Sequence, residues 1–207
     1  MSRQSILSRI RAANAGITVE ERHLSSPPPS LVTHGEEAVT RFCAASRAKG
    51  VTIVESASLQ SIPASVAEAL NSACVSERKV RLNDPVLATL PWSDAGLAVE
   101  RGAAAPHDTL TVSRALAAVA ETGSLMLASG PDNPTTLAFL SETHVVVVDR
   151  TQILSTFEQS TALLRQRYGA DLPRTINFIS GASRTGDIGG RIVLGAHGPR
   201  NLVVVIV

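Results

Sequence analysis

This chain has few aromatic residues, and neither basic nor acidic residues are in excess. Of its 207 residues 3% are Phe, Trp or Tyr, and 19 basic residues against 18 acidic ones leave a formal net charge of +1. Proteins bind nucleic acids through basic surfaces that neutralise phosphates and through aromatic side chains that stack on bases. We therefore expect no nucleic-acid partner.

Cysteine is nearly absent as well. Cys43 and Cys74 are the two cysteines of the chain and lack Cys-x-x-Cys spacing, whereas iron–sulfur clusters are held by about four cysteine thiolates. The five histidines are scattered, with no pair at the spacing of zinc ligands. We expect neither a metal site nor an iron–sulfur cluster within this chain.

Long hydrophobic runs are also missing. No stretch approaches the roughly 20 apolar residues that a membrane-spanning helix needs. The basic N-terminal stretch lacks the continuous apolar segment of a secretory signal. These absences predict a cytoplasmic protein without a membrane span, and a transit peptide is the alternative that the basic, amphipathic residues 2–13 leave open.

Aliphatic residues dominate what is present. The chain is 44% hydrophobic, and short β-branched runs alternate with amphipathic segments. Strands are expected at 51–54, 79–82, 96–99, 108–113, 124–128, 144–148, 175–180 and 202–207, and helices from 36, from 61 and over 152–167. This order predicts an α/β fold with an open, mostly parallel sheet covered by helices.

The N-terminal part differs from this pattern. Residues 2–13 predict an amphipathic helix, and the stretch Ser25-Ser26-Pro27-Pro28-Pro29 predicts an extended linker. We therefore divide the chain into an N-terminal helix and Pro-rich arm, 1–33, and an α/β domain, 34–207. The helix can pack against its own domain, a partner or a second copy of the chain, and self-association stays open.

A polar segment rich in glycine and proline lies between the last two predicted strands. Arg184 and Asp187 are three residues apart, so a short helical turn would place the guanidinium and the carboxylate on one side, ready for a shared ligand. The alternative is an ion pair that only fixes the loop, with His197 as a turn residue.

The loop after strand 124–128 is the second candidate for binding. Asn133 at the N-cap and Pro134 at the first helical position predict a helix start, whose free N–H groups attract anions. Ser129 and Gly130 open this loop. An ordinary strand-to-helix turn is the alternative.

Three segments of the chain resemble the signature of the LUD-domain family, in particular its lactate utilization protein C branch. They read Gly181-Ala182-Ser183-Arg184-Thr185-Gly186-Asp187-Ile188-Gly189, Leu194-Gly195-Ala196-His197-Gly198-Pro199 and Glu121-Thr122-Gly123-Ser124. The chain departs from the family pattern at Ala182, Gly186 and Gly189, which replace Pro, Ala and Glu. A role that needs a carboxylate at position 189 is therefore in doubt.

The resemblance implies a fold similar to that of ribose-phosphate isomerases and CoA transferases. It also implies a non-redox subunit of an L-lactate dehydrogenase complex, which oxidises L-lactate to pyruvate with iron–sulfur partner proteins. This chain would then carry no cofactor, and the clusters would lie in the partners. The alternatives are a stand-alone enzyme, CoA transferase-like with Glu121 as acyl acceptor or sugar-phosphate isomerase-like, and a purely structural subunit.

Residue chemistry and the resemblance together indicate the candidate site. A small carboxylate or phosphorylated ligand would be bound by Thr122, Gly123, Ser129, Gly130, Ser183, Arg184 and Thr185. The catalytic candidates are Glu121, Asp187 and His197. We expect these residues to meet at one edge of the sheet.

Overall fold

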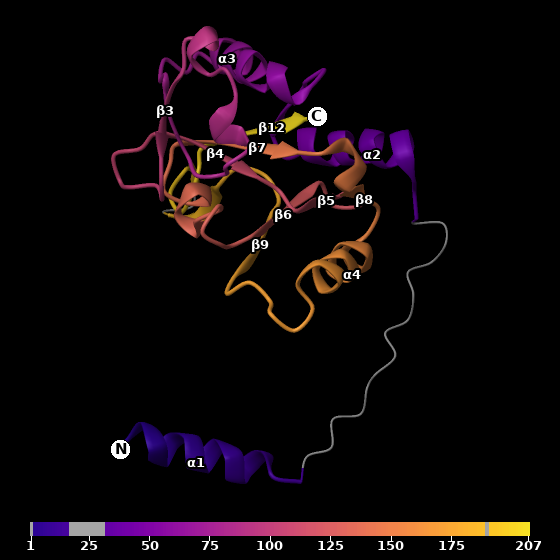
Figure 1. The fold of residues 1–207 in the computed structure, drawn as a ribbon, viewed down its shortest axis with the longest axis vertical. Coiled ribbons are helices and arrows are strands. Elements are labelled where there is room, and N and C mark those ends of the chain that lie inside the picture. Colours follow the sequence, from indigo (N-terminus) through magenta and orange to yellow (C-terminus); the bar gives the residue numbers. More distant parts are fainter. Residues whose placement is uncertain (1, 17–31, 189–190) are drawn as a thin grey trace.

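A six-stranded parallel sheet forms the centre of the fold. The structure, a computed structural model, describes residues 2–16, 32–188 and 191–207. The strand order is β1-β12-β7-β4-β2-β3, and every neighbouring pair is parallel (Figure 1). The strands are Thr52–Glu55 (β1), Asn201–Ile206 (β12), Thr143–Val148 (β7), Leu110–Arg114 (β4), Lys79–Leu82 (β2) and Ala98–Arg101 (β3). The predicted α/β fold with a mostly parallel sheet is confirmed.

The middle of this sheet consists of the β-branched runs that the sequence singles out. All six residues of β7 are buried, and β12 is buried from Leu202 to Ile206. A strand buried on both faces needs apolar side chains at successive positions rather than at alternate ones. The unbroken run Val145 to Val148 therefore belongs at the centre of the sheet.

Each face of the sheet has its own cover. Helix α3, Ile62–Ser72, begins with Pro63 in its first turn and packs Val66 and Leu70 against one face, together with Val145 and Val147. Helix α2, Gly35–Arg47, covers the other face with Phe42. Figure 1 shows α3 and α4 (Phe157–Tyr168) on opposite sides of the sheet.

A second, four-stranded sheet shares the α2 side and was not predicted. Its order is β8-β5-β6-β9, and its strands are Ile153–Leu154 (β8), Ala117–Val119 (β5), Ser124–Ala128 (β6) and Ile176–Ile179 (β9). The strand predicted at 175–180 lies at the edge of this sheet, half-buried, instead of in the main core. β5 and β8 are too short for a period of two to show in the sequence.

Two helix predictions are corrected by the structure. The helix expected after Pro134 is a single 3-10 turn, Thr135–Ala138, because the chain must enter β7 a few residues later. The helix expected from residue 152 begins at Phe157, since Ile153–Leu154 pairs with β5 first.

The segment that contains Arg184 also differs from expectation. Arg184–Ile188 is a strand, β10, paired antiparallel with β11, Arg191–Leu194. The expected helical turn is therefore wrong, because the hairpin satisfies the backbone groups of this segment with cross-strand hydrogen bonds. The side chain of Asp187 and residue Gly189 lie outside the described residues.

The remaining elements are an N-terminal helix and short 3-10 turns. Helix α1, Arg3–Asn14, confirms the predicted helix and exposes all of its residues, whereas the Pro-rich segment at 25–29 lies outside the described residues. In the described ranges, no helix is both long and apolar enough to cross a bilayer. The 3-10 turns are Leu59–Ser61 (η2), Leu87–Thr89 (η3), Ser93–Ala95 (η4), Thr135–Ala138 (η5) and Arg150–Gln152 (η6).

Candidate functional site

A cavity of about 530 Å³ opens at the carboxyl edge of the parallel sheet. We call it the carboxyl-edge cavity. Residues at or just beyond the ends of β2, β4, β7 and β6 line it: Asp84, Arg114, Asp149 and the loop from Ser129 to Asn133. Open α/β sheets bind their ligands beyond the carboxyl ends of the strands, and small-molecule pockets have volumes of roughly 300–1,000 Å³.

The loop that carries Ser129 and Gly130 is fastened by its own backbone. Gly130 and Asn133 exchange N–H···O hydrogen bonds of 3.3 and 3.2 Å, and the Asn133 side chain donates to the Ala128 carbonyl at 3.1 Å. The Ser129 hydroxyl accepts the Thr175 N–H at 2.9 Å. A hydroxyl that accepts one bond can still donate its own hydrogen to a ligand, so Ser129 can hold the loop and contact a ligand at once.

Arg114 is one of two cations that line the cavity, the other being the exposed Arg167, and it lacks a counter-ion among the described residues. It is the half-buried last residue of β4, and within the described ranges no carboxylate pairs with it. Two lining aspartates are already engaged in turns: Asp84 accepts the Val86 N–H at 2.9 Å, and Asp149 accepts the Thr151 N–H at 2.8 Å. Arg114 is therefore free to bind an anionic group.

The rim of the carboxyl-edge cavity adds polar groups of both signs. Arg167, Tyr168, Asp132, Asp171 and Gln152 line it. Arginine binds carboxylate or phosphate through two parallel N–H bonds, and aspartate accepts hydrogen bonds from hydroxyls. The lining suits an acid that also carries hydroxyl groups.

The predicted residues Thr122 and Gly123 lie at the other end of β6. β6 has five residues, and a strand rises about 3.3 Å per residue, so its first and last residues are roughly 13 Å apart. Ser129 and Gly130 follow its last residue, whereas Thr122 and Gly123 precede its first. The structure therefore separates the predicted binding residues instead of placing them all around one cavity.

The turn with Gly123 packs tightly against the end of α2. Gly123 has a φ of +61°, and a Cβ on it would lie 2.7 Å from the Ser46 backbone nitrogen. Ser46 donates its hydroxyl hydrogen to the Gly123 carbonyl at 3.3 Å. Glycine is needed here for the left-handed backbone and for the close approach of the helix.

Glu121 has a structural partner. Its Oε1 accepts the Phe157 N–H at 2.9 Å, at the first turn of α4. A carboxylate at this position satisfies a helix N–H that has no intrahelical acceptor and complements the helix dipole. This contact accounts for a carboxylate at position 121 by a structural role.

Lys49, which sequence reasoning missed, joins segments that are far apart in the chain. Its ammonium donates to the Thr122 carbonyl and to the Ser180 hydroxyl, the latter at 2.5 Å. Ser180 also accepts a hydrogen bond of 3.0 Å from Ser124. A single lysine beyond a helix end has no sequence signal that could have indicated this position.

The predicted residues of the C-terminal hairpin lie beside Lys49. The Arg184 guanidinium lies against Gly50, whose φ of +75° and missing Cβ leave room for it. Ser183 accepts the His197 N–H at 3.3 Å and donates its own N–H to the Pro199 carbonyl at 2.8 Å. We call Lys49, Thr122, Ser124, Ser180 and Arg184 the amino-edge cluster, because Lys49 and Gly50 precede β1.

The other predicted residues of the hairpin stand outside this cluster. Thr185 is half-buried and pairs with Val193. Asp187 lies on β10, and His197 is exposed on the loop that leads into β12. Among the described residues, no group of three or more His, Cys, Asp or Glu side chains is placed to hold a metal ion.

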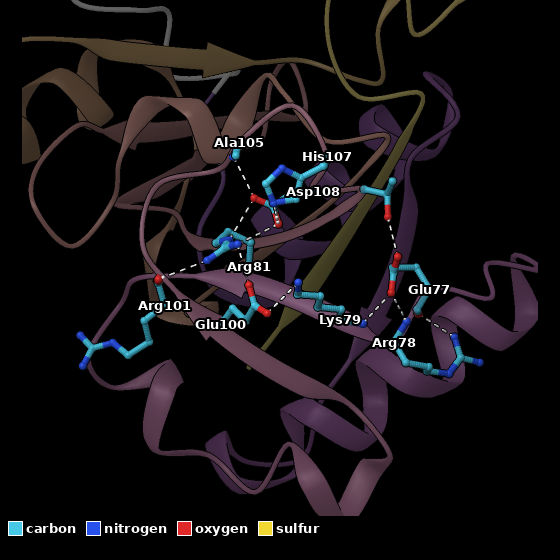
Figure 2. Close-up of polar contacts among 10 residues, drawn as sticks. Glu77, Arg78, Lys79, Arg81, Glu100, Arg101, Ala105, His107 and Asp108 are labelled. Atoms are coloured by element: carbon cyan, nitrogen blue, oxygen red, sulfur yellow. Dashed lines mark hydrogen bonds and ion pairs between the residues drawn. The ribbon is translucent and has the colours of Figure 1, made fainter.

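A third polar cluster, over β2–β4, shows what a closed network looks like (Figure 2). Asp108 is 6% exposed and accepts from Arg81 Nε at 3.0 Å, from Arg81 Nη2 at 3.1 Å and from the Ala105 N–H at 2.8 Å. Arg81 also contacts Glu100 at 2.7 Å, and Glu100 pairs with Lys79 at 2.6 Å. Burial acts to raise the pKa of Asp108, but the hydrogen bonds from Arg81 and Ala105 outweigh it and keep this pKa below its usual value.

His144 is a buried base near the start of β7. One ring nitrogen, Nε2, lies 2.7 Å from the Ser113 hydroxyl, whereas Nδ1 has no partner in the described part of the chain. Burial lowers the pKa of His144 to about 3. The ring is therefore neutral at physiological pH.

This chain is similar to curated proteins named lactate utilization protein C. It is 32% identical over 91 residues to lactate utilization protein C of Geobacillus thermodenitrificans and 31% identical over 91 residues to that of Bacillus subtilis. An uncharacterized protein of Neisseria meningitidis is 34% identical over 89 residues. Each match spans 43% of this chain and 38% of the relative, so the chain covers well under half of the curated relatives it matches.

One solved structure and one family model cover far more of the chain. The crystal structure of a DUF162 family protein from Deinococcus radiodurans superposes with a TM-score of 0.64 at 23% identity, over 84% of this chain and 98% of the other, which supports the fold. The LUD domain model matches residues 33–207. Because this match extends over most of the sequence, the chain belongs to the LUD domain family.

Proposed function

We propose that this chain is a non-redox subunit of a lactate-utilisation system that, with iron–sulfur partner proteins, oxidises L-lactate to pyruvate. The family and the curated relatives named lactate utilization protein C support this role. Cys43 and Cys74 are too few to ligate a cluster, so the electron carriers would belong to the partners. The proposal places the protein in the cytoplasm.

The ligand part of the proposal rests on one observation, the unpaired Arg114 in the carboxyl-edge cavity. An arginine that is half-buried without a counter-ion gains more from an anionic ligand than an exposed arginine does, because water screens it less. We propose that Arg114 binds the acid group of a small carboxylate or phosphorylated molecule, with Ser129 and the Gly130 backbone beside it. Ser183, Arg184 and Thr185 would then serve a different site at the amino edge.

Growth on L-lactate tests this role. A strain without the gene for this chain should fail to grow on L-lactate and grow normally on glucose, and the wild-type gene should restore growth. Arg114→Gln should restore little growth, because glutamine keeps hydrogen bonding and loses the charge. Arg101→Gln is the matched control, since Arg101 also ends a strand of the sheet but is exposed outside the cavity. Full growth with Arg114→Gln would contradict the ligand site.

Affinity purification tests the partners. The tagged chain, taken from cells grown on L-lactate, should bring down proteins that contain iron and labile sulfide, and these should be missing from glucose-grown cells. A chain that is purified alone but turns over an acyl-CoA would instead favour the stand-alone enzyme.

A further inference from the structure

The amino-edge cluster holds two cations that no described carboxylate neutralises. Most ion pairs of the described residues join an arginine or lysine to Glu or Asp: Lys79–Glu100, Arg81–Glu100, Arg81–Asp108, Arg150–Glu36, Arg150–Glu55 and Arg200–Glu142. Neither Lys49 nor Arg184 belongs to such a pair. Two positive charges at one end of a sheet repel each other unless an anion lies between or beside them.

Lys49 is held in place by neutral groups. Its ammonium has three donor hydrogens, and the Thr122 carbonyl and the Ser180 hydroxyl account for two of them. Its side chain packs on Gly181, where a Cβ would lie 3.1 Å from the Lys49 Cβ. The ammonium is therefore oriented in advance, with one donor left for another acceptor.

Arg184 approaches the same two residues from the hairpin. Its guanidinium lies against Gly50, the neighbour of Lys49, while Gly181 lies on Lys49 itself. Loop 180–184 thus contacts both residues: Ser180 and Gly181 contact Lys49, and Arg184 contacts Gly50. Arg184 is exposed, so its remaining donors can reach a ligand from solvent.

We propose that Lys49 and Arg184 form an oxyanion site at the amino edge of the sheet, separate from the carboxyl-edge cavity, with the Ser180 hydroxyl as a further donor. A phosphate or a carboxylate supplies the oxygens that an ammonium and a guanidinium prefer. Glycine at both positions leaves room for this arrangement, because a Cβ at Gly50 would lie 2.4 Å from Arg184 Nη2 and a Cβ at Gly181 would lie 3.1 Å from the Lys49 Cβ.

Anion titration of the full chain tests the site. Inorganic phosphate and, in a parallel arm, sodium acetate are added at constant ionic strength against sodium chloride, with the melting temperature and amide NMR shifts as readouts. At least one anion should stabilise the wild type, and the backbone signals of residues 49, 50 and 181 should shift. The two arms distinguish a phosphate ligand from a carboxylate ligand.

Variants locate the binding. Lys49→Met keeps the stem that packs on Gly181, and Arg184→Gln changes an exposed side chain. Each should weaken the anion affinity about 10- to 100-fold, since a charge-assisted hydrogen bond is lost. Arg47→Gln removes an exposed charge of the last turn of α2 and should leave the affinity unchanged.

Two results would overturn the proposal. One is a wild type that neither phosphate nor acetate stabilises or shifts at residues 49, 50 and 181. The other is an affinity that Arg114→Gln abolishes while Lys49→Met and Arg184→Gln retain it, which would place the anion in the carboxyl-edge cavity and support the proposed function instead. If Lys49→Met does not fold, Arg184→Gln decides.

Discussion

The charged network over β2–β4 and the cations at the two sheet edges use the same types of basic residue but differ in whether carboxylates pair with them. Arg81 meets two carboxylates, and Asp108 receives three hydrogen bonds within the chain. Arg114, Lys49 and Arg184 meet no carboxylate among the described residues. In a closed network the charged groups bind one another and stabilise the fold, so few of their donors and acceptors can bind a ligand. A cation without a carboxylate partner still has donors that can bind an anionic ligand.

Removing Asp108 should have the largest effect, because it opens the closed network. Asp108→Ala leaves Arg81 with a side chain that is only 14% exposed and without its buried partner. We expect the free energy of unfolding to fall by about 3–5 kcal/mol, measured by urea denaturation. Glu100→Gln is the control: this side chain is 43% exposed, and water screens exposed pairs, so the loss should be much smaller. Equal losses in both variants would show that burial does not distinguish the two pairs.

His144 lies between the two cases, with one ring nitrogen bonded and the other without a described partner. Its folded pKa, about 3, lies below the ordinary value of 6.5, so the unfolded chain binds a proton that the folded chain rejects. The contribution of neutral His144 to the free energy of unfolding is therefore fully present above pH 6.5. It falls as the pH drops toward 3, by about 1.4 kcal/mol per pH unit, or roughly 3 kcal/mol between pH 6 and pH 4. Urea denaturation across this pH range measures the slope.

A variant isolates the contribution of His144. His144→Gln cannot titrate, so its stability should lose this part of the slope between pH 6 and pH 4, while the carboxylates and the other histidines titrate alike in both proteins. Parallel curves for the wild type and His144→Gln would contradict a depressed pKa.

Glu121 should give the smallest effect, since it caps a helix that has other support. Glu121→Ala removes the acceptor of the Phe157 N–H and should cost about 1 kcal/mol, with Glu121→Gln losing less because its amide oxygen can still accept. Thermal unfolding measures both. If Glu121→Ala leaves stability intact and the wild type forms a covalent adduct with an acyl-CoA, Glu121 is an acyl acceptor rather than a cap.

Parts of the candidate site were predictable from the sequence because they depend on local chemistry. Glycine next to proline and Asn133 marks the loop at Ser129–Gly130, and this loop does line a cavity. Arg114 and Lys49 carry no such local mark: an arginine at a strand end and a lysine after a helix are ordinary surface residues until the fold shows what surrounds them. The second sheet was missed for a similar reason, since β8 has only two residues.

The sequence by itself determined the parallel α/β sheet, because unbroken β-branched runs such as Val145–Val148 are stable only when both faces are covered. It also determined the family, because the three motif segments occur in it in the family's order. The tertiary structure alone decided that the predicted binding residues divide between two edges and that Lys49 meets Ser180, 131 residues away. Contacts between distant residues depend on how helices and sheets pack. The free energy of packing comes from contacts throughout the molecule, so a short stretch of sequence does not determine it.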